Sequence, residues 1–544
     1  MARVACRFGW SPIAGASTSH AARIIVNDNR YFISTTIPYV NAAPHLGHAL
    51  EFIQTDAFAR YRRARGESTF FLSGSDENSL KNVLAAEAAG RPTREFVEQN
   101  VQYFLELRDA LRLSFDYFIR TSEDPLHLEG AARFWMAMDA AGDIYRKTYG
   151  GLYCVGCEQF YTESELVDGL CPEHETRPEY IEENNYFFRL SRYQDELERL
   201  ISTDAIRIIP ATRRNEALSF IRSGLEDISI SRSQERARGW GIPVPGDPSQ
   251  VMYVWIDALT NYVTALGYAS DGELYREFWL ENENRVHCLG KGVLRFHALY
   301  WPAMLLSVGV PPPTELFVHG YITDRGRKLS KSRGTSVSIP ALVETYGADA
   351  VRYFMLSHVP PTLDADFSEE ELLRRYNGDL GNALGNLLNR TVSMIVRYRA
   401  GSVPRPGDPS PPEIVEAAEQ AYRDVIESMD AYDPRSALAA IWSFVRRLNA
   451  YVDESAPWTL ARDPDAAAQR RLDTVLHTLA EGLRHLAECL SPFIPASADE
   501  IFNQLGAADV ARRRLPGEWD GELAGQTVKP GGLLFPRLLE VESA

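Results

Sequence analysis

Two short segments, far apart in the sequence, carry side chains suited to binding a triphosphate. They are Pro44-His45-Leu46-Gly47-His48 and Lys328-Leu329-Ser330-Lys331-Ser332. The histidines are three residues apart, so one helical turn would place both on the same side, and Gly47 lets a flat ligand approach the backbone. The first segment therefore predicts donors that converge on a phosphate, with simple capping of a helix as the alternative.

Lysine is rare in this chain, which makes the second segment distinctive. The sequence has six lysines among 57 Lys and Arg residues, and two of the six, Lys328 and Lys331, stand three apart. An ammonium group is a compact charge with rotatable donors, so it suits a triphosphate that moves during a reaction. The small residues around both lysines predict a loop that closes over phosphates; the alternative is a solvated basic loop.

The histidines are positioned by a predicted strand, turn and helix. Residues 31–36 have the pattern of a buried strand, and residues 48–64 repeat apolar side chains at helical spacing. Pro44 suits the first helical position and Gly66 the position beyond the last turn. The start of this helix would direct backbone N–H groups and the positive end of its dipole at one spot, which favours phosphate.

The rest of the chain divides into an α/β part and a helical part. Alternating predicted elements, a strand at 69–74 and a helix at 79–89, indicate a parallel sheet whose ligand lies at the carboxyl ends of the strands. Apolar runs at 286–290 and 316–322 would supply a second half-sheet. Long periodic segments at 413–429, 436–452 and 469–490 predict a closing helical bundle, with the proline-rich stretch 404–412 as a surface loop.

Together the two segments resemble the HIGH and KMSKS motifs of class I aminoacyl-tRNA synthetases. From Ile33 to about Leu505 the chain is similar to methionyl-tRNA synthetases in particular. The matching stretches are Ile37-Pro38-Tyr39-Val40-Asn41, Tyr253-Val254-Trp255-Ile256-Asp257-Ala258, His319-Gly320-Tyr321 and Tyr346-Gly347-Ala348-Asp349-Ala350. The resemblance implies activation of L-methionine by ATP with Mg²⁺ and transfer to initiator and elongator tRNA(Met). The cytoplasm is the expected location, because the sequence contains no apolar run long enough to span a membrane.

The resemblance also implies roles for individual residues. ATP would be bound by His45, Gly47, His48, Lys328, Ser330, Lys331 and Ser332, the histidines and lysines being catalytic. Methionine would lie in an apolar slot with one polar handle, formed by Ile37, Tyr39, Trp255, Ala258, Tyr262, Phe296 and His297, with Asp76 on its ammonium group. The anticodon would be read by Asn386, Arg390 and Trp458, unless Trp458 is a core residue.

Three cysteines and a histidine have the spacing of a zinc knuckle. Cys154 and Cys157 form one pair, and Cys171 and His174 form the second. Two intervening residues allow each pair to reach one tetrahedral centre, and four protein ligands make a structural rather than a catalytic zinc site. A disulfide is the disfavoured alternative, because His174 stands where a fourth cysteine would be.

The predicted fold is a class I Rossmann-type parallel sheet with an inserted zinc-knuckle connective peptide, followed by an all-α anticodon-binding bundle. The expected divisions are an N-terminal extension at 1–29, the first catalytic half at 30–122, the insertion at 123–248, the second catalytic half at 249–325, a stem-contact region with the KLSKS loop at 326–375, and the helical domain at 376–544. The net charge of −17 leaves nucleic-acid binding to local basic patches. No apolar run approaches the length of a membrane span, and a monomer is expected.

Several features keep other functions open. Asn78-Ser79 stand where His-Gly commonly follows Asp-Glu, Gly292 stands where Asp commonly follows Gly-Lys, and Leu259 is unusual in the slot wall. A specialised duplicate that activates a methionine-like substrate or confers inhibitor resistance is the first alternative, and a non-catalytic tRNA-binding protein is the second. Cysteinyl enzymes need a cysteine ligand that Thr36-Ile37 does not offer, and the isoleucyl, valyl and leucyl enzymes are much longer.

Overall fold

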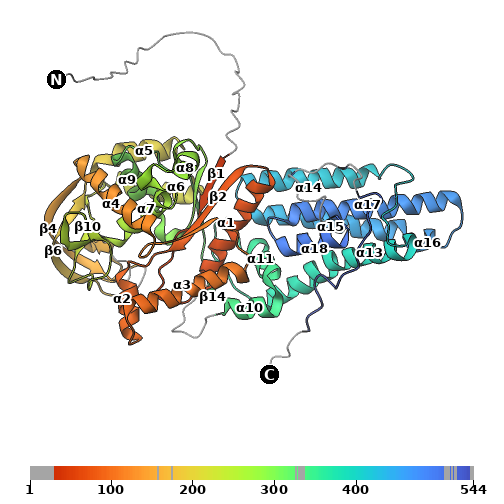
Figure 1. Ribbon diagram of the computed structural model, residues 1–544, viewed down its shortest axis with the longest axis horizontal. Coiled ribbons are helices and arrows are strands. Elements are labelled where there is room, and N and C mark those ends of the chain that lie inside the picture. The colour runs from red at the N-terminus through yellow and green to blue at the C-terminus, as the bar shows by residue number, and fades with distance from the viewer. Residues whose placement is uncertain are drawn as a thin grey trace, which may run out of the picture.

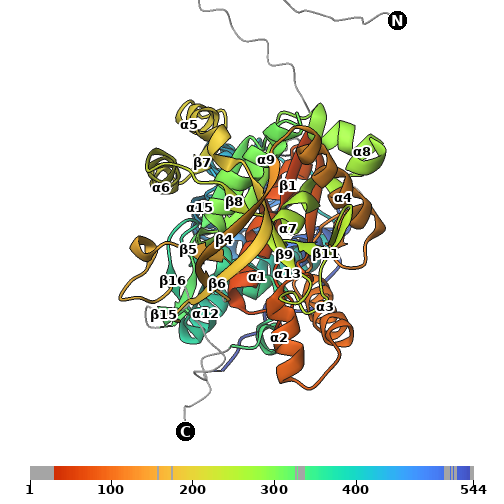
Figure 2. The same cartoon turned by 90° about the vertical axis from the view of Figure 1, so that its left-hand side faces the viewer.

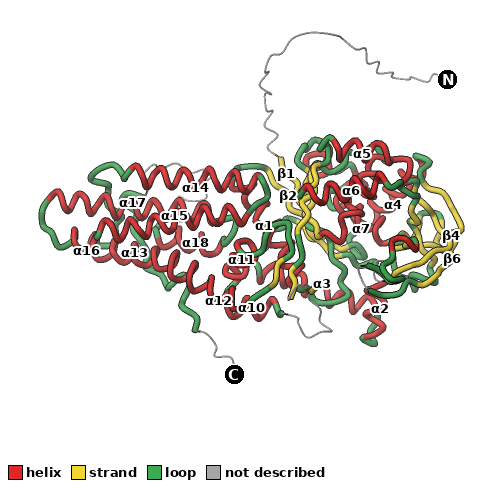
Figure 3. Tube along the Cα trace, turned by 180° about the vertical axis from the view of Figure 1, so that it is seen from behind, coloured by secondary structure: helices red, strands yellow, loops and turns green. Residues whose placement is uncertain are grey.

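The computed structural model places an α/β part beside a bundle of helices (Figure 1). It describes residues 30–155, 159–172, 175–324, 327–328, 337–507, 515, 519 and 523–539. Seen from behind, the strands gather in one half of the molecule and the other half is helical (Figure 3). Among these residues no helix is both long and apolar enough to traverse a lipid bilayer.

A six-stranded parallel sheet forms the centre of the α/β part. Its order is β3-β2-β1-β12-β13-β7. The strands are β1 (Arg30–Ser34), β2 (Ser68–Ser75), β3 (Tyr117–Arg120), β7 (Arg207–Ile209), β12 (Arg285–Gly290) and β13 (Glu315–His319). Alternate residues of β1 pack on opposite sides, with Phe32 in one core and Tyr31 and Ile33 in the other. Both faces are therefore covered, as a parallel sheet requires.

Helices cover the two faces of this sheet. One core includes residues of α1 (Leu46–Ala64) and α3 (Thr93–Ala110), and the other includes residues of α4 (Pro125–Ala140) and α7 (Val254–Thr264). The remaining helical segments near the sheet are α2 (Leu80–Ala88), α8 (Glu273–Tyr275), η4 (Arg276–Leu280), η5 (Lys291–Val293), η6 (Phe296–Tyr300) and α9 (Trp301–Ser307). The predicted first strand, first helix and parallel sheet are thus confirmed.

Three details differ from the sequence prediction. The first helix begins at Leu46 with His45 as its N-cap, so Pro44 lies outside the helix; Gly66 follows its last turn with φ +80°, as predicted. The predicted strand at 316–322 ends at His319, and the next residue must be glycine, because a Cβ on Gly320 would lie 2.1 Å from the Leu363 carbonyl carbon. Strand β7 falls in the range predicted for the insertion, yet it pairs with β13 at the edge of the main sheet.

The insertion carries smaller antiparallel sheets, which face the viewer in Figure 2. One sheet contains β4 (Ile144–Cys154), β5 (Gln159–Tyr161), β6 (Glu179–Phe188) and β8 (Ile228–Ser229). A second contains β9 (Ser231–Ser233), β10 (Pro243–Val244) and β11 (Asp247–Met252). Helices α5 (Gln194–Ser202) and α6 (Ala211–Arg222) complete it.

A short linking region leads to the helical bundle. It contains β14 (Ile322–Asp324), β15 (Arg327–Lys328), α10 (Ile339–Tyr346), α11 (Ala348–Ser357), β16 (Ala365–Asp366) and α12 (Glu369–Arg375). The bundle is formed by η8 (Tyr376–Gly385), α13 (Asn386–Arg399), α14 (Pro412–Asp430), α15 (Pro434–Ser455), α16 (Pro457–Leu460), α17 (Ala466–Leu490) and α18 (Pro495–Gln504). The three long predicted helices are confirmed within three residues at each end.

Two buried contacts join the bundle to the α/β part. Arg352 of α11 forms an ion pair with Asp56 of α1 at 2.7 Å and donates to the carbonyl oxygens of Pro492 and Phe493, between α17 and α18. Tyr432, between α14 and α15, donates to Glu315 of β13 and lies 2.9 Å from the Tyr31 hydroxyl. The start of the six-stranded sheet and the first helix are therefore packed directly on the bundle.

Candidate functional site

The two histidines of the first motif form the N-terminal cap of α1. The Nδ1 atom of His45 accepts from the Gly47 N–H at 3.1 Å, and Nδ1 of His48 accepts from the His45 N–H at 3.2 Å. Their rings stack with centroids 3.8 Å apart. Both histidines therefore cap the helix, and after the prediction made for them we call His45, Gly47 and His48 the phosphate corner.

Capping by Nδ1 has a chemical consequence for these rings. A neutral imidazole whose Nδ1 accepts carries its proton on Nε2, so Nε2 of each ring is a hydrogen-bond donor, the type of group that binds anions. Gly47 serves this arrangement directly, because a Cβ there would lie 2.9 Å from His45 Cε1. The glycine thus makes room for the His45 ring, a tighter requirement than the ligand approach predicted from sequence.

The second motif is only partly described by the structure. Lys328 is the last residue of β15, which pairs with β14 so that Lys328 stands opposite Thr323. Ser330, Lys331 and Ser332 lie outside the described residues. Strand β14 also pairs with β16, so Lys328 belongs to a small three-stranded sheet that begins just beyond the carboxyl end of β13.

Most predicted methionine residues meet in one aromatic slot, which we define as Ile37, Tyr39, Trp255, Ala258, Tyr262, Phe296 and His297. Trp255 and Phe296 stack face to face with centroids 3.7 Å apart, and Tyr39 meets Trp255 edge-on. Three of the members come from one helix, α7, at spacings of three and four residues. The Trp255 indole N–H is buried without a hydrogen-bond partner among the described residues, so it remains available to a ligand.

A chain of buried hydrogen bonds fixes the floor of the slot. His297 Nδ1 lies 3.0 Å from the Val293 carbonyl and must donate, so its Nε2 accepts from the Tyr262 hydroxyl at 2.7 Å. Burial lowers the pKa of His297 to about 4 and raises that of Tyr262 well above its ordinary value. Both groups are therefore neutral near pH 7, as suits an apolar side chain.

His287 supports this floor and was not predicted from sequence. Its ring lies 4.0 Å from that of Tyr262 between centroids, and its Nε2 accepts from the Trp301 indole at 3.2 Å. Its Nδ1 lies 2.7 Å from Ser34 Oγ. Burial holds its pKa well below the ordinary range. The sequence indicates this role of His287 only through its place in an apolar strand, because a polar residue in a buried strand needs hydrogen-bond partners.

Asp76 lies next to Tyr39 of the slot, directly after β2. It is buried, its N–H donates to the Pro38 carbonyl at 2.8 Å, and it forms a bridge with Tyr39. The structure thus brings the predicted ammonium-binding residue beside the slot. Lys81 Nζ lies 4.7 Å from the centre of the Tyr39 ring, a cation at this rim that was not predicted.

A second unpredicted pair connects the phosphate corner to the second half-sheet. Glu51, one turn after His48, accepts from the N–H of Thr36 at 2.7 Å and lies 2.8 Å from Nε2 of His319. His319 Nδ1 is 2.7 Å from the Gly320 carbonyl. The signal in the sequence was a carboxylate three residues from His48, on the same face of the helix.

The residues that depart from the family pattern have distinct places. Asn78 donates to Asp257 at 2.7 Å, and Ser79 caps α2 by accepting from the Lys81 N–H. Gly292 lies in η5, where its neighbour Lys291 pairs with Asp364 at 2.7 Å. Leu259 is buried in the core beneath the slot.

Two of the four predicted metal ligands are described. Cys154, at the end of β4, and Cys171 are both buried and share a small cluster with Tyr161. Cys157 and His174 lie outside the described residues, and the described ones alone contain no group of three metal-binding side chains. The two buried thiols come from positions 17 apart in the sequence and share one cluster, and cysteine thiols are ligands of structural zinc.

The three predicted anticodon residues lie together on the bundle. Asn386 is exposed and Arg390 half-buried on α13, and the Arg390 guanidinium lies 5.9 Å from the ring centre of Trp458. Arg390 also pairs with Asp453 at 2.9 Å. Trp458 is 38% exposed, so it is not a core residue. An exposed indole beside a guanidinium suits stacking of an unpaired base.

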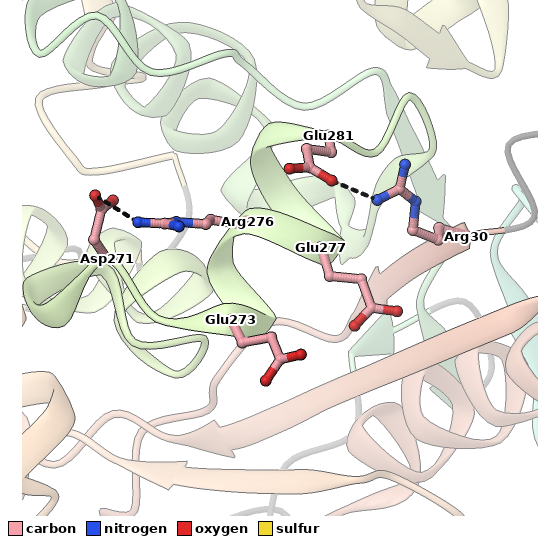
Figure 4. Close-up of a pocket in the computed structure, with 6 residues that line it drawn as sticks. All are labelled: Arg30, Asp271, Glu273, Arg276, Glu277 and Glu281. Carbon is pink, nitrogen blue, oxygen red and sulfur yellow. Dashed lines mark hydrogen bonds and ion pairs between the residues drawn. The ribbon is translucent and has the colours of Figure 1, made fainter.

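A charged hollow of about 590 Å³ lies at the other end of the sheet (Figure 4). Arg30, at the start of β1, pairs there with Glu281, and Arg276 pairs with Asp271. Because ligands of parallel sheets bind at the carboxyl ends of the strands, this hollow at the amino ends is not the candidate site.

Comparisons with known proteins agree with this geometry. Residues 31–177 and 173–392 match the model of class I tRNA synthetases (M), and residues 412–527 match the anticodon-binding domain of tRNA ligases. The methionine–tRNA ligase of Caldanaerobacter subterraneus is 42% identical over 93% of this chain and 79% of its own, and that of Mycobacterium bovis is 42% identical over 93% and 96%.

A solved structure shares the whole architecture. Mycobacterium tuberculosis methionyl-tRNA synthetase bound by methionyl-adenylate superposes with a TM-score of 0.86 at 41% identity, covering 93% of this chain and all of that one. Matches of this extent include both the α/β part and the bundle. The chain therefore belongs to the methionyl-tRNA synthetase family.

Proposed function

We infer that the protein is a methionine–tRNA ligase that activates L-methionine with ATP and transfers it to tRNA. One observation carries this conclusion. A neutral aromatic slot lies beside the buried carboxylate of Asp76, in a chain 41% identical to a synthetase solved with methionyl-adenylate. An apolar slot suits a thioether, and the carboxylate suits an ammonium group.

In the first step the methionine carboxylate attacks the α-phosphate of ATP and pyrophosphate leaves. No protein nucleophile is needed, so catalysis rests on positioning and on stabilising charge on the phosphate oxygens. His45 and His48 donate to the α-phosphate region through Nε2. Lys328 and Lys331, together with Mg²⁺, neutralise the departing pyrophosphate. In the second step the terminal ribose of the tRNA takes the aminoacyl group and AMP leaves.

Two further assignments follow from the same family membership. A structural zinc ion is held by Cys154, Cys157, Cys171 and His174, and supplies folding energy to the insertion. Metal analysis of the purified protein tests this assignment, with one zinc per chain as the expected result. The tRNA anticodon is read by Asn386, Arg390 and Trp458, with the indole as a stacking platform.

ATP–pyrophosphate exchange over a panel of amino acids tests the proposed activity. Methionine alone should support rapid exchange, and both initiator and elongator tRNA(Met) should then be charged. Exchange without charging would favour the specialised duplicate that activates a methionine-like substrate or confers inhibitor resistance. Absence of exchange with every amino acid would favour a non-catalytic tRNA-binding protein.

Replacing Trp458 with alanine separates the two halves of the reaction. We expect kcat/KM for tRNA to fall about tenfold, the scale of one lost base stack, while ATP–pyrophosphate exchange stays unchanged. Trp519→Ala is the control, because the Trp519 indole donates to Ser410 at 3.2 Å and so already has a partner within the bundle. An equal loss of exchange in the Trp458→Ala protein would contradict the anticodon role.

A further inference from the structure

Asn78 connects the end of β2 to the helix that carries the slot. Its side-chain amide donates to the Thr121 carbonyl at 3.1 Å and to Asp257 Oδ2 at 2.7 Å. An amide NH₂ has two hydrogens, so both bonds form at once. The acceptors lie after β3 and in the first turn of α7, and Asn78 follows β2.

Asp257 in turn fixes α7 through a buried histidine. Its second oxygen, Oδ1, lies 2.5 Å from Nε2 of His127 on α4, and Nδ1 of His127 lies 2.9 Å from the Thr264 hydroxyl. Asp257 and Thr264 stand at opposite ends of α7, and Asp257, His127 and Thr264 are all buried. The helix is therefore held at both ends by one hydrogen-bonded chain.

The packing of α4 on α7 leaves little freedom for this chain to relax. A Cβ on Gly130 of α4 would lie 2.3 Å from the Thr264 methyl group. The helices are thus in close contact at the carboxyl end of α7. At its other end, the Asn78 amide is a side-chain link from α7 to the loop that follows β2.

The loop after β2 also holds the ammonium-binding carboxylate. Asp76 is tied to the segment 38–39 by its N–H bond to Pro38 and its bridge with Tyr39. Trp255, Ala258 and Tyr262 lie on α7. The bond from Asn78 to Asp257 therefore links two parts of the protein that bind one substrate. The loop after β2 holds the carboxylate for its ammonium group, and α7 carries the slot for its side chain.

We propose that Asn78 is a positioning residue that sets the separation between Asp76 and α7, and thereby the affinity for the amino-acid substrate. The inference rests on the proposed function, since it takes methionine as that substrate. Asn78 does not touch the phosphate corner in any described contact, so the ATP half of the site should not sense it.

The test is steady-state ATP–pyrophosphate exchange with the full-length protein and its Asn78→Leu variant. Leucine keeps the shape of asparagine and removes the donor, leaving a buried carboxylate oxygen of Asp257 without its bond. The KM for methionine should rise about tenfold, while kcat and the KM for ATP stay within about twofold. Asn78→His restores one N–H donor and should recover most of the affinity.

Asn377→Leu is the matched control, because Asn377 makes two bonds to the Leu538 backbone near the end of the chain. It should leave every kinetic constant unchanged. An unchanged methionine KM in Asn78→Leu, an equal rise in the KM for ATP, or an Asn78→His protein as weak as Asn78→Leu would each overturn the proposal.

Two further outcomes are distinguishable. If Asn78→Leu does not fold, Asn78→Asp replaces it: this variant keeps the shape and sets a second carboxylate against Asp257, so it must raise the methionine KM at least as much. If the unmodified protein shows no exchange with methionine, the proposed function fails, whatever the variants do.

Discussion

The site contains two pairs of histidines in opposite surroundings. His45 and His48 stack at the exposed start of α1, where their Nδ1 atoms cap the helix. His287 and His297 lie in the buried floor of the aromatic slot, and burial lowers the pKa of both. The same side chain thus caps an exposed helix end in one region, and in the other it is neutral and joins two buried hydrogen-bond partners.

The difference follows from the charge that each region must accept. ATP brings several negative charges, which need water-accessible donors and lysines that can move with them. A thioether brings none, so any charge in its slot would only weaken the apolar contact. Changes in the phosphate corner and its loop should therefore alter rate, whereas changes in the slot should alter substrate affinity or stability.

The largest effect should come from Lys331→Ala in the second motif. Loss of a cation on the pyrophosphate should slow adenylate formation by about 10²-fold or more, the scale of one lost oxyanion donor. Single-turnover formation of methionyl-adenylate measures this directly. Lys529→Ala, an exposed lysine near the end of the chain, serves as the matched control. Unchanged ATP–pyrophosphate exchange in Lys331→Ala would refute the role.

His45→Asn should produce a smaller loss and separates capping from chemistry. Asparagine is as good an N-cap as any residue, so thermal stability should be kept. The amide cannot place a donor where Nε2 of the imidazole lies, so exchange should slow about tenfold. A variant with full activity would show that His45 serves only the helix.

The smallest effect concerns the slot and appears as a pH dependence of stability. The unfolded chain binds a proton at His297 near the ordinary pKa of 6.5, whereas the folded protein does so only near pH 4. The unfolded state therefore gains protons first, and stability falls as the pH falls through 6.5. Between pH 7.5 and 6 the titration of His297 should lower the free energy of unfolding by about 1 kcal/mol.

The His297→Gln variant lacks this titration and keeps a side chain of similar polarity. Urea unfolding followed by tryptophan fluorescence at the two pH values should show a smaller loss in the variant than in the unmodified protein. Trp255 lies beside His297, so the signal reports on the slot. Equal losses in both proteins would show that burial does not keep His297 neutral.

Local pattern predicted the elements of the fold well. The apolar period predicted the first helix and the long bundle helices, and resemblance identified the slot residues, because these signals lie in short stretches of sequence. The position of Pro44 was misjudged, since the cap is set by the His45 side chain. The predicted strand at 316–322 was too long, since it ends at His319; the close approach of residue 363 to Gly320 is a long-range contact that an apolar run does not reveal.

The supporting contacts of the site were beyond the reach of local pattern. Asn78 meets Asp257, and Glu51 meets His319, across 179 and 268 positions in the chain. Such pairs depend on which strands become neighbours in the sheet and on side-chain rotamers. The spacing of apolar residues in the sequence gives no information on strand order or on rotamers. The sequence marked Asn78 only as an unusual residue, and the structure supplied its partner.

The ion pair between Arg352 and Asp56 has a consequence for how this enzyme can be divided. Both side chains are fully buried, and removing one partner of such a pair typically costs about 3–5 kcal/mol. Arg352 donates two further hydrogen bonds to carbonyl oxygens in the turn between α17 and α18. A catalytic fragment cut off before the bundle would lose both acceptors and keep the buried charge. The α/β part and the bundle are therefore separate in sequence, but the stability of the first depends on the second.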